Sequence, residues 1–364
     1  MLESLTSRRA LLLGALSLAG GAVSACSPGR GTARPGPTSS TSPVTSEFVT
    51  SPTTAPSAPS TTSAPFNPAT PYITPNDRFY RIDTSIEAPQ VDAATWSMTV
   101  EGLVDRPLTL SYADLLARPQ VKRTITLACV SNYVGGLLVG NAEWEGVLLA
   151  DVLREAGVQD SAEQVFTTSV DGWTCGFPVA AALDGRDALI ALRINGEPLP
   201  AEHGYPVRLV VPGLYGYVSA TKWLSSIRLT TWEEESFWIR VGWSREGPIK
   251  TQCRIDLPRS GTEIDVGPTM IAGVAWAPHT GVAKVEVQID NGEWIEAELG
   301  DEDLDDAWRL WRLPWTATPG SHLLRARTTD KTGVTQTDQP APPEPDGATG
   351  YPTRGFRVVD RTAR

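Results

Sequence analysis

The sequence predicts an α+β domain followed by an all-β sandwich of immunoglobulin type. Residues 72–262 mix short β-like runs with helical stretches, whereas residues 263–360 are dominated by alternating apolar and polar side chains. The chain has 364 residues, of which 41% are hydrophobic, and this is enough for two packed domains. Before them we expect an export signal at residues 1–25 and a disordered linker at residues 26–71.

The mixed character of the first domain follows from two kinds of pattern. Apolar β-like runs occur at residues 96–100, 123–127 and 207–211. A helix is expected to start with residues 148–155 and to end at Gly157, because glycine is the residue type that most often terminates a helix. Strands and helices are therefore expected along the same domain.

The sandwich is predicted from strict alternation. Val285, Val287 and Ile289 lie on one face of an expected strand, and the charged or polar residues between them lie on the other. The tripeptide at residues 290–292, Asp-Asn-Gly, is typical of a tight hairpin turn. Further strands are expected at residues 270–276, 294–299, 308–315 and 323–329.

The N-terminal residues resemble a targeting segment. Arg8 and Arg9 precede a short apolar run at residues 10–19, which suits either twin-arginine export or general secretion. Val-Ser-Ala before Cys26 resembles a bacterial lipobox, so Cys26 is expected to carry the lipid and to be the sole membrane contact. The Ser/Thr/Pro-rich linker would tether the protein to the outer face of the cytoplasmic membrane or the cell wall.

Composition excludes several function classes. A net charge of -11 argues against a nucleic-acid partner, which requires a basic face. Three His and no Cys-x-x-Cys motif argue against zinc, iron–sulfur clusters and haem in this chain. Besides Cys26 there remain Cys129, Cys175 and Cys253, so at most one disulfide is possible, and whether Cys175 and Cys253 pair stays open.

Three segments are rich in residue types that can bind a ligand or take part in a reaction. The first is the strand end that delivers Cys129 at residues 127–132, the second is the His- and Arg-flanked strand at residues 202–213, and the third is the loop at residues 214–223. Arg, Lys, hydroxyls and free backbone N–H groups together suit a phosphate or pyrophosphate.

Taken together these segments resemble the sulfite oxidase superfamily of molybdenum enzymes. The match includes Thr-Leu-Ala-Cys at residues 126–129, the long signature at residues 195–213 and Lys-Trp-Leu at residues 222–224, and it spans about residues 72–359. The resemblance implies a molybdenum–molybdopterin cofactor with Cys129 as the metal ligand. It assigns the pterin and its phosphate to His203, Arg208, Ser219, Thr221 and Lys222, with Thr168 as a further candidate.

The resemblance also implies partners. It points to dimerisation through the C-terminal domain, for which Trp294, Trp308, Trp311 and Trp315 are candidate interface residues. Because the chain has no haem-binding domain, we expect electrons to pass to an external carrier, either a cytochrome or a membrane carrier.

The substrate site departs from the sulfite-oxidising pattern. Tyr133 and Val134 stand where the family has arginines, and Trp243 stands where it has a tyrosine. Arg81 is the remaining candidate cation for the substrate. The predicted catalytic set is therefore Cys129, Arg81 and Trp243, and we expect a small substrate other than sulfite, such as a sulfoxide or N-oxide, in either redox direction.

Two other functions compete with this hypothesis. Cys129 could be a nucleophile activated by His203, as in thiol hydrolases. The chain could instead be a cell-surface binding module whose cofactor site has decayed.

Overall fold

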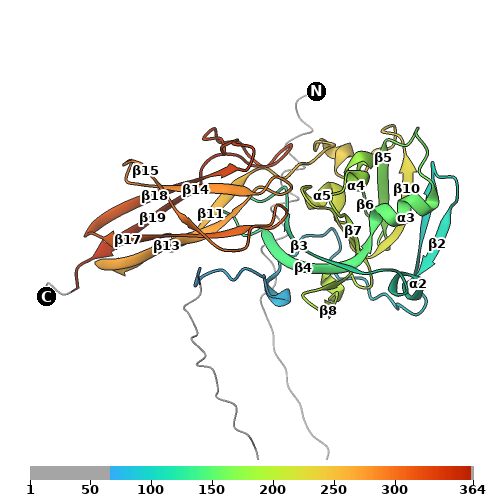
Figure 1. The fold of residues 1–364 in the computed structure, drawn as a ribbon, viewed down its shortest axis with the longest axis horizontal. Helices are drawn as coiled ribbons and strands as arrows, with labels where there is room; N and C mark the ends of the chain where they lie inside the picture. Colours follow the sequence, from blue (N-terminus) through green and yellow to red (C-terminus); the bar gives the residue numbers. More distant parts are fainter. Residues whose placement is uncertain (1–65, 362–364) are drawn as a thin grey trace, which may run out of the picture. The chain divides into compact units, whose positions relative to one another are not determined.

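The computed structural model describes residues 66–361, and these belong to one compact unit. They form a mostly β structure with few, short helices, and the strands make four sheets (Figure 1). The α component of the predicted α+β domain is small, because most segments between strands are loops or single helical turns. No helix of residues 66–361 is long and apolar enough to cross a membrane.

The first sheet has the strand order β2-β1-β10-β5-β6. Its strands are β1 (Ser97–Gly102), β2 (Leu108–Ser111), β5 (Gln164–Ser169), β6 (Thr174–Pro178) and β10 (Leu224–Thr230). β1 and β10 pair in parallel although they are far apart in sequence, whereas the other pairs are antiparallel. The β run expected at residues 96–100 corresponds to β1.

The second sheet has the order β3-β4-β7-β8, with β9 added beside β7. Its strands are β3 (Val121–Ala128), β4 (Val139–Leu148), β7 (Leu189–Ile194), β8 (Glu197–Pro198) and β9 (Arg208–Val210). Ala128 is paired with Val139, so the loop from β3 to β4 begins at Cys129. The expected strands at residues 123–127 and 207–211 are confirmed.

The helices are short connectors. They are α2 (Tyr112–Leu116), α3 (Leu149–Ala156), α4 (Val179–Leu183) and α5 (Gly216–Ser219), with 3₁₀ turns η2 (Asn76–Arg78), η3 (Ala201–His203) and η4 (Ile239–Val241). α3 confirms the helix expected at residues 148–155. It ends at Gly157, whose φ of 72° is left-handed and whose N–H donates to the Leu153 carbonyl.

Two further sheets enclose one core in the C-terminal part. Their orders are β11-β13-β17-β16 and β12-β19-β18-β14-β15. The strands are β11 (Gln252–Leu257), β12 (Glu263–Asp265), β13 (Gly267–Trp276), β14 (Val282–Ile289), β15 (Trp294–Glu296), β16 (Glu298–Leu299), β17 (Arg309–Ala317), β18 (Gly320–Asp330) and β19 (Thr353–Val359). Cys253 and Trp311 of one sheet and Val285 and Leu324 of the other belong to the same buried cluster.

The turn after β14 has the predicted form. Asp290 and Asn291 have φ values of 51° and 62°, and the Gly292 N–H donates to the Ile289 carbonyl. The prediction of a single strand at residues 294–299 is wrong. This segment divides at the buried Ala297, because β15 pairs with β14 in one sheet and β16 pairs with β17 in the other.

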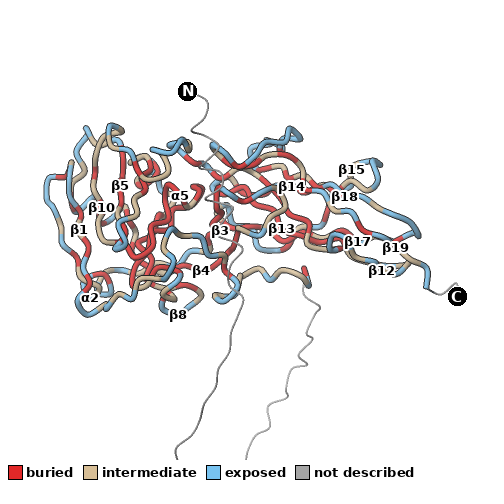
Figure 2. The backbone as a smooth tube through the Cα atoms, turned by 180° about the vertical axis from the view of Figure 1, so that it is seen from behind, coloured by how far each residue is buried: buried red, intermediate tan, exposed pale blue. Residues whose placement is uncertain are grey.

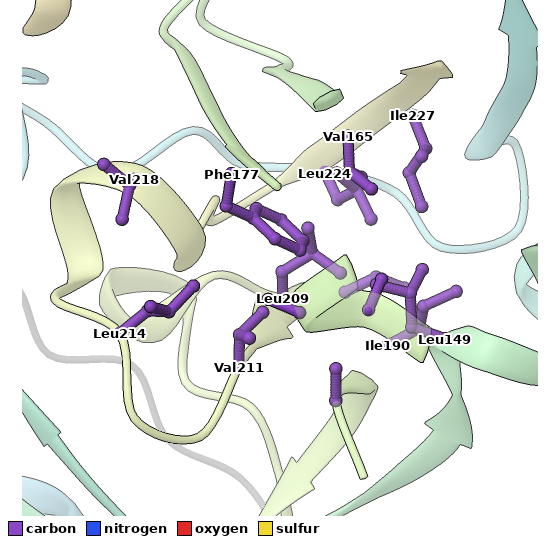
Figure 3. Packing of buried hydrophobic residues seen from close by; sticks show 14 of the residues in the cluster. Leu149, Val165, Phe177, Ile190, Leu209, Val211, Leu214, Val218, Leu224 and Ile227 are labelled. Carbon is purple, nitrogen blue, oxygen red and sulfur yellow. The ribbon is translucent and has the colours of Figure 1, made fainter. Parts of the chain in front are cut away.

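The hydrophobic core continues from the first two sheets into β13 and β17. The buried segments of all four sheets are marked in Figure 2. Trp276, Trp308 and Leu310 belong to the same cluster as the residues in Figure 3, which labels Leu149, Val165, Phe177, Ile190, Leu209, Val211, Leu214, Val218, Leu224 and Ile227. The Trp308 indole N–H donates to the Tyr72 carbonyl at 2.8 Å.

Two of the four tryptophans expected at an interface are core residues. Trp308 and Trp311 are 2% and 0% exposed within a single chain. Alternation on β17 turns Trp311 inward, and the backbone N–H of Trp308 donates to the Thr126 hydroxyl of β3. The predictions for the export signal, the lipobox at Cys26 and residues 26–65 of the linker lie outside the described residues.

Candidate active site

Cys129 lies directly after β3, as the strand-end motif predicts. Its backbone N–H donates to the Leu138 carbonyl at 2.9 Å, and its own carbonyl accepts the Asn132 N–H at 3.0 Å. Its side chain is 9% exposed and borders a pocket. Burial raises the pKa of the thiol against a weaker opposing effect of hydrogen bonds from Ser131, so an adjacent cation is needed to favour the thiolate.

The loop that follows Cys129 is shaped by Asn132. The Asn132 amide oxygen accepts the Leu138 N–H at 2.9 Å. A Cβ on Gly136 would lie 2.5 Å from that oxygen, so glycine is required there. Tyr133 is 66% exposed and is absent from the pocket wall. The loop thus contributes no cation to the pocket.

The pocket beside Cys129 combines two cations, two carboxylates and many aromatic rings. Its polar lining includes Asp83, Asp171, Arg208 and Lys222. Its aromatic lining is Phe79, Tyr80, Trp173, Tyr217, Trp223, Trp238 and Trp243. The structure therefore brings together Cys129, Arg208, Lys222 and Trp243 from the predicted set.

Arg208 is a buried cation at the start of β9. Its guanidinium donates to the His203 carbonyl at 3.1 Å and lies 5.0 Å from the centroid of the Trp144 ring. The side chain forms no ion pair with a carboxylate of residues 66–361. Burial lowers the pKa of Arg208 to about 10, because nothing there compensates its desolvation in full.

Lys222, unlike Arg208, has a carboxylate partner in the described part of the chain. Its ammonium group donates to Asp83 Oδ2 and to the Glu202 carbonyl, each at 2.9 Å. Burial and then the charge of Arg208 lower the pKa of Lys222 to about 8, against the opposing effect of Asp83. Burial acts to raise the pKa of Asp83, but hydrogen bonds from Arg81 and Lys222 lower it overall. The pair is therefore ionised at neutral pH.

His203 has one ring nitrogen without a partner. Nε2 lies 3.1 Å from the Asn76 carbonyl oxygen and must donate to it, whereas Nδ1 is buried with no hydrogen-bond partner in residues 66–361. Burial, followed by the charge of Arg208, lowers the pKa of His203 to about 4, so the ring is neutral. The Ser169 hydroxyl, from a residue that lines the pocket, is likewise buried and unpartnered among these residues.

Arg81 and Trp243 occupy different surroundings. The side chain of Arg81 is 41% exposed and donates to Asp83 at 2.9 Å, and the residue is absent from the pocket wall. Trp243 lines the pocket and packs on Tyr217 and Trp238 at centroid distances of 5.6 and 6.2 Å. Of the two predicted substrate contacts, only Trp243 borders the pocket.

The hydroxyls of Ser219 and Thr221 are engaged inside the protein. Ser219 Oγ donates to the Tyr215 carbonyl at 3.0 Å. Thr221 Oγ1 lies 2.6 Å from Thr167 Oγ1 and 3.0 Å from Cys175 Sγ. These side chains orient the backbone beside the pocket and do not line it.

Thr168 is also absent from the pocket wall, which Ser169 borders instead. Successive side chains of a strand point to opposite faces, so Thr168 faces away from Ser169. The three cysteines of the described part, Cys129, Cys175 and Cys253, are all free and buried, so Cys175 and Cys253 do not pair.

Several residues with polar groups at the pocket were not predicted from the sequence. They include Tyr80, Asp83, Thr84, Ser169 and Asp171. Tyr80 and Asp83 lie in the same segment as Arg81, but this segment is a loop, and no periodicity shows which of its side chains turn inward.

The hydrolase hypothesis finds no support in this geometry. A nucleophilic cysteine needs a base within hydrogen-bond reach and a lowered pKa. No Cys129–His203 hydrogen bond occurs in residues 66–361, His203 bonds to the Asn76 carbonyl, and the pKa of Cys129 is raised.

Comparison with known proteins agrees with the site. Residues 85–238 match the family described as oxidoreductase molybdopterin binding domain. The chain is 33% identical to mitochondrial sulfite oxidase of Rattus norvegicus over 291 residues, which cover 66% of this chain and 53% of the rat protein. It is 30% identical to sulfite oxidase of Gallus gallus over 320 residues, which cover 74% of this chain and 69% of the chicken protein.

The fold agrees as well. The structure is similar to that of the sulfane dehydrogenase SoxCD from Paracoccus pantotrophus, with a TM-score of 0.67 over 79% of this chain and 84% of that chain, at 24% identity. The chain spans about half the length of the rat enzyme that it matches, 53%. From the matched domain and the relationship to the chicken enzyme, the chain belongs to the sulfite oxidase family and carries its molybdopterin-binding oxidoreductase domain.

Proposed function

We propose that this chain is an exported molybdenum-cofactor oxidoreductase that transfers an oxygen atom between water and a small substrate and exchanges two electrons with an external carrier. The overall change is substrate plus water giving oxidised substrate, two protons and two electrons, or the reverse. The observation that carries the proposal is the buried thiol of Cys129 on the same pocket as Arg208, a buried cation without a carboxylate partner in residues 66–361.

The residues present fit the cofactor. An anionic phosphate would supply the counter-charge that Arg208 lacks, and charge-assisted hydrogen bonds of this kind are strong. The unpaired Nδ1 of neutral His203 is an acceptor for a pterin N–H, and the unpaired Ser169 hydroxyl is a further polar contact. When bound, the cofactor supplies the oxygen-atom and two-electron chemistry.

The chain contributes binding, orientation and exclusion of water. Cys129 offers one soft thiolate ligand on a rigid strand end, which suits a metal whose other ligands come from the cofactor. Asp83 holds Lys222 in place, and the Thr167–Thr221–Cys175 hydrogen bonds hold the backbone next to Lys222. These contacts form a preorganised pocket wall.

The pocket favours a substrate less charged than sulfite. Its cationic lining residues, Arg208 and Lys222, are the ones proposed to bind the cofactor phosphate, and its carboxylates, Asp83 and Asp171, add negative charge. A dianion desolvated there would lack compensating cations. Arg81 itself is absent from the pocket wall and is already paired with Asp83, so it adds no free cation. The aromatic rings supply most of the remaining surface, so we propose a neutral sulfoxide, N-oxide or organic sulfur compound as substrate.

Two measurements test this proposal. Metal analysis of the purified protein is expected to give roughly one molybdenum per chain. Steady-state kinetics would compare sulfite plus an artificial acceptor with a panel of sulfoxides and N-oxides plus a reduced dye. Sulfite turnover with kcat/KM of order 10⁶ M⁻¹s⁻¹, well within the range of efficient enzymes, would refute the substrate proposal. A protein without molybdenum would refute the enzyme proposal and favour a binding module.

Location and assembly are further parts of the proposal. Arg8-Arg9 and Cys26 support twin-arginine export and lipid anchoring on the outer face of the membrane, and labelling of wild type and Cys26→Ser with a radioactive fatty acid tests the anchor. We retain the immunoglobulin-like assignment of the C-terminal sheets and dimerisation through them. Because Trp308 and Trp311 are buried, such an interface must use other residues, and light scattering of the full chain tests it.

A further inference from the structure

Tyr80 carries the pocket's unengaged phenol hydroxyl. Two tyrosines line the pocket, Tyr80 and Tyr217. The Tyr217 hydroxyl donates to the Ser244 carbonyl at 2.5 Å. The Tyr80 hydroxyl forms no hydrogen bond with any of residues 66–361. A polar group that borders a binding pocket and is left without a protein partner is available to a ligand.

The orientation of the Tyr80 ring is fixed by the core. The ring stacks on Phe79 at a centroid distance of 5.3 Å, and Phe79 packs edge-on against Trp144 at 5.5 Å. Phe79 and Trp144 are 5% and 0% exposed, and the Trp144 indole donates to the Ile125 carbonyl of β3. Tyr80 is therefore preorganised by packing, with little rotamer freedom to lose on binding a ligand.

The hydroxyl of Tyr80 lies near the last residue of β3, the strand that precedes Cys129. A Cβ added to Gly216, the first residue of α5, would lie 3.9 Å from the Tyr80 hydroxyl and 4.0 Å from the carbonyl oxygen of Ala128, the residue before Cys129. Gly216 is thus close to both groups, and Tyr80, Cys129 and Gly216 line the same pocket.

The hydroxyl is a donor at all physiological pH values. Burial raises the pKa of Tyr80, and the negative charge of the nearby Cys129 thiolate raises it further, against a smaller opposing effect of Arg208. A neutral phenol donates its single proton to an acceptor. Trp243, at the place where a tyrosine was expected from the family resemblance, offers no hydroxyl, so Tyr80 can supply one from another element.

We propose that Tyr80 determines substrate specificity by donating a hydrogen bond to the oxygen of a neutral substrate with an S–O or N–O bond. This inference rests on the proposed oxidoreductase function. It assigns oxygen recognition to a residue of the loop at residues 79–84 and leaves the aromatic walls to contact the rest of the substrate.

The test compares Tyr80→Phe with Tyr217→Phe, a matched removal of a hydroxyl that is already engaged. Binding to the full-length holoenzyme would be followed by quenching of tryptophan fluorescence, because Trp173, Trp238 and Trp243 line the pocket. The probes are dimethyl sulfoxide, which has the acceptor oxygen, and dimethyl sulfide, which lacks it. Molybdenum content would be measured for each variant.

We expect Tyr80→Phe to weaken dimethyl sulfoxide binding about 2- to 12-fold, the worth of one neutral hydrogen bond, and to leave dimethyl sulfide binding and metal content unchanged. Tyr217→Phe should not discriminate between the probes. Equal losses for both probes, no loss, or no saturable quenching in the wild type would each overturn the proposal. If the selective loss occurs without turnover of any sulfoxide, Tyr80 still recognises the oxygen and the proposed reaction is what fails.

Discussion

Replacing Arg208 by methionine should stabilise the cofactor-free protein while abolishing cofactor retention. Arg208 is 4% exposed, and burial lowers its pKa to about 10, which corresponds to about 3 kcal/mol of unfavourable interaction of the charged form. At neutral pH the guanidinium is charged in both folded and unfolded chains, so this cost is fully present; it decreases only as the pH rises above the folded-state pKa.

The stabilisation gained by Arg208→Met is smaller than the full free-energy cost of burying the guanidinium. Methionine fills similar space without a charge, but the variant loses the hydrogen bond to the His203 carbonyl and the contact with the Trp144 ring. We therefore expect the free energy of unfolding of the cofactor-free protein to rise by about 1–2 kcal/mol. In the loaded protein, removing a charge-assisted phosphate contact should release cofactor and metal together.

Arg254→Met is the matched control. Arg254 is also buried, at 4% exposure, but it is paired with Asp256, so the variant leaves a buried carboxylate without its counter-ion, with hydrogen bonds from Asn67 and Thr70 only within residues 66–361, and should lose about 3–5 kcal/mol. Urea unfolding of both cofactor-free variants, followed by tryptophan fluorescence, and molybdenum content after expression would measure the two effects. Destabilisation of Arg208→Met as large as that of Arg254→Met, or full metal retention, would refute the reasoning.

Cys129→Ser should lose metal and activity while its circular dichroism stays native, because a poorer ligand replaces the thiolate on an unchanged strand end. Full activity of this variant would refute the assignment of Cys129 as the metal ligand. His203 has a folded-state pKa of about 4, below its unfolded value, so the stability it contributes is present above about pH 6.5 and is lost as the pH falls toward 4; His203→Asn should flatten this part of the urea-midpoint profile. Trp308→Ala should cost about 3–5 kcal/mol of unfolding free energy, and a chain ending at Gly261 should fail to fold, because Trp276, Trp308 and Leu310 complete the core of the first two sheets; a folded fragment with native circular dichroism would contradict this.

Sequence patterns alone suffice to predict the family, the strand end that carries Cys129 and the hairpin at Asp290-Asn291. These features depend on local chemistry, namely an ordered motif, period-two alternation and left-handed backbone positions, and such signals are contained within a few consecutive residues. The helix ended by Gly157 was predictable for the same reason.

Long-range packing determines which polar groups face the pocket. The loop at residues 79–84 has no periodicity, so only packing of Phe79 on Trp144 turns Tyr80 inward and leaves Arg81 with Asp83. Long-range contacts likewise engage Thr221 with Cys175 and place Trp308 against Thr126 and Tyr72 in a shared core. Burial lowers the pKa of Arg208 and of His203, and this burial depends on the distances between elements far apart in the chain, which no local pattern encodes.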